Sequence, residues 1–144
     1  MNARVKELMT ANPTLISPDA TLQEAAEKME KIDCGVLPVG KESNLEGIIT
    51  DRDIVTRAIS KGKNPAKEKV KDYMSKKVHA CKESDALRDV ADQMQKHKVS
   101  RLIVKNDSGK VTGILSLGCI LRKEADAEEI VDVIERTRGK ACAA

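Results

Sequence analysis

Hydrophobic side chains recur at the spacing of one helix face in two stretches of the chain, which lie 65 residues apart. The two sets are Leu22, Ala25, Ala26 and Met29, and Leu87, Val90, Ala91 and Met94. Each set predicts an amphipathic helix whose methionine belongs to the core. Thr21, with Glu24 three residues later, predicts a capping box before the first helix, and Ser84 can cap the second.

Short apolar runs separated by turn residues follow each predicted helix and indicate a pair of strands. The strands are predicted at Val36–Val39 and Gly47–Thr50, then at Leu102–Val104 and Val111–Ser116, with turns at Lys41–Asn44 and Asn106–Gly109. The remaining predicted elements are a helical turn (Val5–Met9, Val70–Met74), a short strand (Thr14–Ile16, Val78–Ala80) and a closing helix (Asp51–Ser60, Leu117–Lys123).

These elements form one β-α-β-β-α unit that occurs twice. A shift of 65 residues places Val5 on Val70 and Leu37 on Leu102, and one inserted residue then places Gly47 on Gly113. A single unit would leave one sheet face bare, so we expect an α/β (α+β) fold in which two pseudo-twofold-related units pack sheet on sheet. The predicted division is repeat 1 (1–60), a linker marked by Gly62, Asn64 and Pro65 (61–69), repeat 2 (70–123) and a C-terminal helix and tail (124–144).

The C-terminal helix is predicted at Asp126–Arg138, with an apolar stripe that includes Ile130, Val133 and Ile134. Acidic residues early and arginines late suit the helix dipole, and Gly139 ends the pattern. The apolar side could dock on its own domain or on a second subunit, and the sequence does not separate these alternatives.

Composition removes several classes of function. The 144 residues include one tyrosine and no other aromatic residue, which argues against binding single-stranded nucleic acid by stacking. Lysines gather at Lys61–Lys71, which we interpret as a solvated linker rather than a nucleic-acid arm. No apolar run is long enough to span a membrane and no signal peptide is evident, so we expect a cytoplasmic protein. Four cysteines without a Cys-x-x-Cys pair predict free thiols, and His79 and His97 are too scattered to suggest a metal site.

The segment Gly47–Ile54 is the best candidate for chemistry, because a strand ends and a helix begins at Thr50. Thr50 offers a hydroxyl, Arg52 can fork onto a phosphate, and Asp53 could accept two hydrogen bonds from a ribose diol. Thr50 and Asp53 also have the spacing of a capping box, and spacing alone favours the capping role.

The two repeats resemble cystathionine-β-synthase-type (CBS) repeats, and the pair resembles a Bateman module, from Val5 to about Arg122. The resemblance is carried by Met9 with Thr14-Leu15-Ile16, by Gly35-Val36-Leu37-Pro38-Val39, and by Thr50-Asp51-Arg52-Asp53-Ile54. The last run is similar to that of small stand-alone bacterial and archaeal CBS-pair proteins.

The resemblance implies a site for AMP, ADP, ATP, S-adenosylmethionine or, less often, NAD-type molecules, with no cofactor required. Asp53 would take the ribose hydroxyls, and Thr50 and Arg52 the phosphate. The adenine would lie against Gly35, Val36, Leu37 and Pro38, with Thr14 and Ile16 completing the wall and Arg101 reaching a phosphate across the pseudo-twofold axis.

Repeat 2 departs from the family pattern. Ser116 keeps the hydroxyl and can still cap, but Ser100, Ile103 and Cys119 replace the Gly, Pro and Asp of the family motif, and Gly118 stands where repeat 1 has Arg52. We therefore expect one competent site and one weak or empty site. Cys119 could be a reactive thiol, although a small semi-buried core residue is the favoured interpretation.

The predicted function is that of a regulatory adenine-nucleotide sensor that acts in trans, through an effector protein or as a homodimer. The alternative is a ligand-free dimerisation or scaffold module. An enzyme is not expected, because the sequence has no Ser/His/Asp or Cys/His arrangement, no metal cluster and no P-loop. Nucleic-acid and membrane partners are not expected either.

Overall fold

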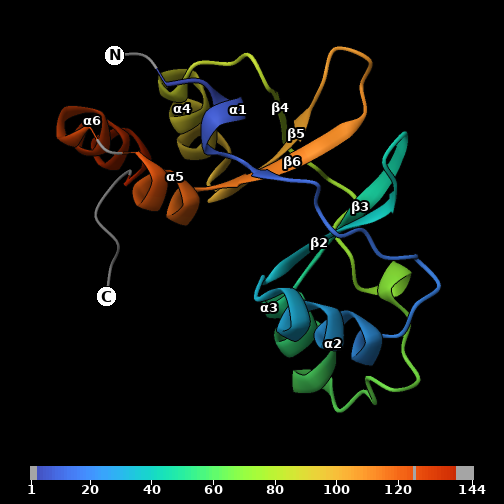
Figure 1. The fold of residues 1–144 in the computed structure, drawn as a ribbon. Helices are drawn as coiled ribbons and strands as arrows, with labels where there is room; N and C mark the ends of the chain where they lie inside the picture. The colour runs from blue at the N-terminus through green and yellow to red at the C-terminus, as the bar shows by residue number, and fades with distance from the viewer. Residues whose placement is uncertain (1–2, 125, 139–144) are drawn as a thin grey trace. The chain divides into compact units, whose positions relative to one another are not determined.

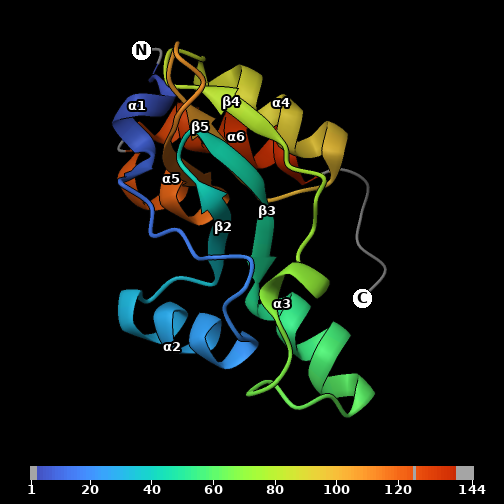
Figure 2. The same cartoon turned by 90° about the vertical axis from the view of Figure 1, so that its right-hand side faces the viewer.

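The computed structural model describes residues 3–124 and 126–138, which form two compact units, each with its own hydrophobic core (Figures 1 and 2). The repeat-1 unit is the continuous segment 13–78, and the repeat-2 unit combines residues up to Asn12 with residues from His79 onwards. Among the described residues, no helix has both the length and the apolar character needed to cross a membrane.

The repeat-1 unit is built on one antiparallel strand pair, in which Val36 pairs with Thr50. Its elements are α2 (Leu22–Ile32), β2 (Val36–Lys41), β3 (Asn44–Thr50), α3 (Asp51–Asp53), a π-helical stretch (Ile54–Ala58), and two 3₁₀ turns (Ile59–Lys61, Val70–Asp72). The predicted closing helix thus exists, but its second turn is widened into a π-helix. The core joins α2 to the inner faces of both strands and includes Leu22, Leu37 and Ile49.

The repeat-2 unit holds a four-stranded sheet in the order β1-β6-β5-β4, with β4 parallel to β5 and the other pairs antiparallel. Its elements are α1 (Val5–Leu8), β1 (Thr10–Ala11), β4 (Ala80–Lys82), α4 (Leu87–His97), β5 (Arg101–Lys105), β6 (Val111–Ser116), α5 (Leu117–Lys123) and α6 (Ala127–Thr137). The mixed α/β fold that the spacing of apolar residues predicted is confirmed.

Each repeat begins with a leading segment, which includes Val5 in repeat 1 and Val70 in repeat 2. This leading segment belongs to the compact unit of the other repeat. The backbone N–H of Val5 donates to the carbonyl of Asp85 (3.1 Å), and the N–H of Val70 donates to the carbonyl of Ala20 (2.8 Å). Val5 and Val70 are both fully buried, in the repeat-2 core and the repeat-1 core respectively. The compact units therefore divide the chain differently from the duplicated sequence.

Two equivalent glycines allow these leading segments to cross a strand at close range. A Cβ on Gly47 would lie 2.5 Å from the carbonyl oxygen of Ser75, and a Cβ on Gly113 would lie 2.9 Å from that of Thr10. Real Cβ atoms essentially never approach backbone oxygen atoms so closely. Glycine at both positions is thus required by the crossing.

The start of α4 corrects one prediction. Ser84 does not cap this helix, whose N-cap residue is Ala86 and has no side-chain cap. The first N–H of α4, that of Leu87, donates instead to the carbonyl of Ala3 (3.1 Å) in the leading segment. In α2, by contrast, Thr21 Oγ1 accepts from the N–H of Glu24 (3.1 Å), as the capping motif predicts.

The predicted positions of the short strands, Thr14–Ile16 and Val78–Ala80, differ from those in the structure. β4 begins two residues after the start of the predicted strand at Val78, and β1 was not predicted. Thr14–Ile16 is not a strand, because only Ile16 pairs with β2, donating to the Pro38 carbonyl (3.0 Å) and accepting from the Gly40 N–H (2.9 Å). Pro38 has no N–H with which to continue this pairing towards Thr14.

α6 docks on its own unit, which answers the question left open by its sequence. Val133 is buried against the repeat-2 core, and the guanidinium of Arg136 donates to Asp92 of α4 (2.9 Å). Asp126 caps the helix by accepting from the N–H groups of Glu128 and Glu129. Gly139, the predicted end signal, lies outside the described residues.

The exchange of leading segments predicts a crossed pattern of local stability. Val5→Ala should lower the free energy of unfolding by about 2 kcal/mol through lost apolar burial and a residual cavity. It should speed amide exchange in α4 of the repeat-2 unit, while the equivalent change Val70→Ala should do so in α2. Hydrogen exchange read by mass spectrometry checks this, and faster exchange in α2 alone after Val5→Ala would contradict it.

Candidate functional site

Nine of the eleven residues proposed from the sequence lie in the repeat-1 unit, whose strand β3 passes directly into α3 (Figure 2). They are Thr14, Ile16, Gly35, Val36, Leu37, Pro38, Thr50, Arg52 and Asp53. The other two, Arg101 and Ser116, are in the repeat-2 unit, where they face each other across β5 and β6.

The junction is held by backbone bonds between the start of β2 and the start of α3. Val36 pairs with Thr50, and the N–H of Asp51 donates to the carbonyl of Gly35 (3.0 Å). A Cβ on Gly35 would lie 2.7 Å from Oδ2 of Asp51, so glycine leaves room for this carboxylate. Asp51 belongs to the motif quoted from the sequence but was given no role there, and it is a second acid at the junction.

Thr50 and Asp53 form a reciprocal capping box. Thr50 Oγ1 accepts from the N–H of Asp53 (3.1 Å), and Asp53 Oδ2 accepts from the N–H of Thr50 (3.0 Å). The capping role that spacing favoured is therefore confirmed. Asp53 Oδ1 accepts no hydrogen bond from any other described residue, so half of this carboxylate remains available.

The walls of the site differ in what they can offer to a ligand. Ile16, Val36 and Leu37 are buried, and Ile16 and Leu37 belong to the repeat-1 core, so their side chains serve packing. Arg52 is exposed, and its guanidinium forms no ion pair with the described residues, which leaves it available to an anion.

The backbone of Thr14 offers an acceptor that sequence reasoning missed. In the repeat-2 unit the N–H of Ile103 donates to the carbonyl of His79 (3.0 Å), and the shift of 65 residues places these two on Pro38 and Thr14. Pro38 cannot donate, and no described residue donates to the Thr14 carbonyl. The signal was present in the sequence as a proline in one copy and an isoleucine in the other.

The equivalent junction in the repeat-2 unit has the same backbone but different chemistry. The N–H of Leu117 donates to the carbonyl of Ser100 (2.9 Å), and Ser116 Oγ accepts from the N–H of Cys119 (3.0 Å). Cys119 is 7% exposed, and its Sγ lies 3.2 Å from Thr10 Oγ1 and 3.6 Å from Arg122. The favoured interpretation of Cys119 as a small core residue fits this burial.

The environment of Cys119 nevertheless shifts its acidity. Burial raises the pKa of the thiol, but hydrogen bonds from Thr10 and Ser116 and the charges of Lys123 and Arg122 lower it, and the net pKa is below the ordinary value. The repeat-2 junction therefore lacks the acids of repeat 1 and has cations beside it.

The described cysteines Cys34, Cys81 and Cys119 are free, and no metal-binding cluster of three or more side chains occurs among the described residues. The two histidines, which the sequence left unrelated, stack with ring centroids 4.0 Å apart. His79 directly precedes β4, and His97 is the last residue of α4.

Known proteins share the duplicated sequence of this chain. A model of the CBS domain matches twice, at residues 5–60 and 70–126. The CBS domain-containing protein YhcV of Bacillus subtilis is 33% identical over 114 residues, which cover 79% of this chain and 80% of YhcV.

Two solved structures are close in fold. The conserved CBS-domain protein TA0289 of Thermoplasma acidophilum has a TM-score of 0.79 at 26% identity, over 96% of this chain and 78% of that one. The CBS domain pair of protein MJ0100, solved in complex with 5-methylthioadenosine and S-adenosylmethionine, has a TM-score of 0.73 at 27% identity, over 85% of this chain and 95% of that one.

The two hydroxyl caps should contribute similarly to stability. Thr50→Ala and Ser116→Ala should each lower the free energy of unfolding by about 1 kcal/mol, because each leaves a helix N–H without its acceptor. Thr56→Ala, on the exposed face of the π-helical stretch, is the matched control and should change it by less than about 0.5 kcal/mol. Urea denaturation measures all three, and an effect of Thr56→Ala as large as that of the caps would contradict the assignment.

Cys81 should make the fold sensitive to alkaline pH. Burial, with a smaller effect of the Asp85 charge, raises the pKa of this thiol to about 12. A raised folded-state pKa favours the neutral thiol, so its contribution to stability is complete below the unfolded-state pKa of about 8.5 and is lost as the pH rises towards 12. Urea denaturation between pH 8 and 11 should show a shallower decline for Cys81→Ala than for the parent, and equal slopes would contradict the prediction.

Proposed function

Because this chain belongs to the CBS-domain family and carries two tandem repeats, we propose that it is a regulatory module that binds one adenosine-containing molecule in its repeat-1 unit and acts in trans on a partner protein. The observation that carries the proposal is the unpaired carbonyl of Thr14 beside Pro38, at the edge of a junction with available acidic and cationic groups. No catalytic step is proposed, because the junction residues cap, pair and pack.

The Thr14 carbonyl suits an adenine ring. A carbonyl oxygen can accept a hydrogen bond from the exocyclic amino group of adenine, whereas guanine presents an oxygen at the equivalent position. Pro38 keeps this acceptor available by withholding an N–H, and we propose the Val36–Pro38 backbone as the edge against which the adenine packs. The ring would lie against this edge with its amino group towards Thr14.

The ribose and the group beyond it would lie at the start of α3. Asp53 Oδ2 is occupied by the Thr50 N–H, and Oδ1 remains to accept from a ribose hydroxyl. Thr50 and the unpaired guanidinium of Arg52 suit a phosphate. The adenosine ligands bound by the CBS pair of MJ0100 support this class of molecule for the present chain.

We propose a single competent site. In repeat 2 the N–H of Ile103 already occupies the carbonyl of His79, which closes the acceptor that Pro38 keeps open in repeat 1. Cys119 replaces the acid and offers no carboxylate to a diol. Both changes remove an interaction that adenosine would use.

Isothermal titration calorimetry with AMP, ADP, ATP and S-adenosylmethionine tests the proposal, with GMP and CMP as controls. At least one adenine ligand should bind with a stoichiometry of one per chain, and Asp53→Ala should weaken it by about thirtyfold through the lost hydrogen bond to a charged acceptor. Asp53→Glu should keep the cap, since Glu is favoured at this position of a capping box, and still weaken binding through its longer side chain.

Pro38→Ile is the sharpest variant, because it copies the residue that repeat 2 carries. It supplies an N–H to the Thr14 carbonyl, so it should preserve stability in urea while weakening the adenine ligand by about tenfold. Undiminished affinity in Pro38→Ile would show that the ligand does not use the Thr14 carbonyl. Undiminished affinity in Asp53→Ala would place the site elsewhere.

A homodimeric scaffold without a ligand is the second candidate. It is favoured by the exposed apolar side chains of Val55 and Ile59, which follow the junction on the π-helical stretch and the 3₁₀ turn after it. Sedimentation equilibrium should then show a dimer that Val55→Ser dissociates, while the full nucleotide panel fails to bind.

A further inference from the structure

The apolar stripe of α6 is wider than its contact with α4. Val133 is 1% exposed, whereas Val131 is 54% and Ile134 is 43% exposed. At 3.6 residues per turn, the apolar positions from Val133 through Ile130, Ile134 and Ala127 to Val131 span about 160° of the helix. A stripe of about 100° suffices for a helix that packs on one side, so an apolar strip remains on the outer face.

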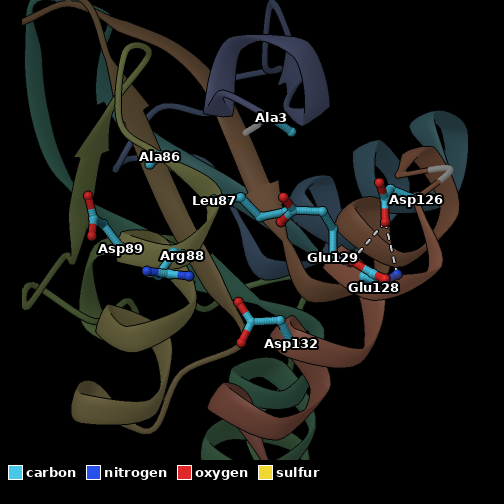
Figure 3. A pocket seen from close by; sticks show the side chains of 9 residues that line it. All are labelled: Ala3, Ala86, Leu87, Arg88, Asp89, Asp126, Glu128, Glu129 and Asp132. Atoms are coloured by element: carbon cyan, nitrogen blue, oxygen red, sulfur yellow. Dashed lines mark hydrogen bonds between the residues drawn. The ribbon is translucent and has the colours of Figure 1, made fainter. Parts of the chain in front are cut away.

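A row of carboxylates borders this strip. Glu128, Asp132 and Glu135 succeed one another on the same flank of α6 and line a groove of about 320 Å³ together with Ala127 and Val131. Glu128 and Asp132 also line a hollow of about 460 Å³ between α6 and the start of α4, where Asp89 adds a further acid (Figure 3). The groove and the hollow thus form one continuous surface, which we call the α6 surface.

The fold itself uses only part of this negative charge. Asp126 caps α6, and Asp132 accepts a hydrogen bond from Arg136 (2.9 Å). The carboxylates of Asp89, Glu128 and Glu135 form no hydrogen bond or ion pair with other described residues. Helix dipoles account for acids in the first turns of α4 and α6, but not for Glu135 near the end of α6.

We propose that the α6 surface is the docking site for a basic amphipathic segment of a partner protein. The apolar residues of that segment cover Val131 and Ile134, and its lysines or arginines lie along Glu128, Asp132 and Glu135. This is the helix-in-groove mode of recognition, in which an apolar stripe gives affinity and the flanking charges fix orientation. The proposal names the partner class for the trans action proposed above, and it requires no bound nucleotide.

The same charges argue against a second copy of this chain as the occupant. If α6 packed antiparallel on α6 of another copy, Glu128 would stand opposite Glu135 of the second copy. A parallel arrangement would place each carboxylate against its own counterpart. Like charges facing each other oppose association, whereas a cationic segment neutralises the whole row.

Fluorescence anisotropy with a labelled synthetic peptide tests the proposal on the full chain. The probe is a leucine-lysine peptide of about 14 residues that forms an amphipathic helix, and an isomer of alternating sequence, which cannot form that face, is the control peptide. The amphipathic peptide should bind saturably and the isomer about tenfold more weakly. Amide shifts in a nuclear magnetic resonance titration should gather on α6 and the start of α4.

Two variants and a matched control locate the interaction. Glu128→Lys with Glu135→Lys should weaken the peptide by about tenfold, and Val131→Ser by about threefold. Glu27→Lys with Glu30→Lys on α2 makes the same change in net charge and should leave affinity within about twofold. Circular dichroism confirms that each variant is folded.

The outcomes separate this proposal from its alternatives. Equal weakening by the α2 control, or shifts outside α4 and α6, would show attraction by net charge alone and overturn the proposal. A concentration-dependent dimer that Val131→Ser dissociates would assign the surface to a second copy and also overturn it. Asp53→Ala should bind the peptide like the parent, so failure of the nucleotide site and failure of this surface are distinguishable.

Discussion

The reciprocal exchange of leading segments is the constraint on which the rest of the structure depends. Each core includes a valine from the leading segment of the other repeat, Val5 in the repeat-2 unit and Val70 in the repeat-1 unit. The same segments supply the carbonyls that receive the first N–H of α4 and of α2, from Ala3 and Glu68 respectively. Each helix start and each core therefore depends in part on residues from the leading segment of the other repeat.

The two units share this backbone arrangement but differ in chemistry, first at Pro38 and Ile103. A backbone N–H at Ile103 extends the strand pairing in one unit, and its absence at Pro38 stops it in the other. The acceptor that repeat 2 uses in its own sheet is the acceptor that no described residue of repeat 1 pairs with. The acids follow the same division, since Asp51 and Asp53 stand where repeat 2 has Leu117 and Cys119.

Patterns within one element were predictable from the sequence, and contacts between distant segments were not. The stripes that begin at Leu22 and Leu87 located α2 and α4, and the spacing of Thr50 and Asp53 predicted the capping box. Ser84 failed as a cap because the competing acceptor, Ala3, lies more than eighty residues away. β1 was missed because Thr10 and Ala11 have no alternating pattern and become a strand only by pairing with β6. The free carbonyl of Thr14 could be recognised only by comparing the two copies residue by residue, once the strand pairing of repeat 2 was known.

The discontinuity of one unit also sets an order of assembly during synthesis. The repeat-1 unit is a continuous segment, so all of its residues, including Val70 and Met74, have been synthesised before most of the repeat-2 unit exists. Val5 and Asn12 are synthesised before this segment, yet their partners Asp85 and Thr112 are synthesised after it. During synthesis the segment that includes Val5 therefore waits for its partners, while all residues of the unit with the candidate nucleotide site are already present.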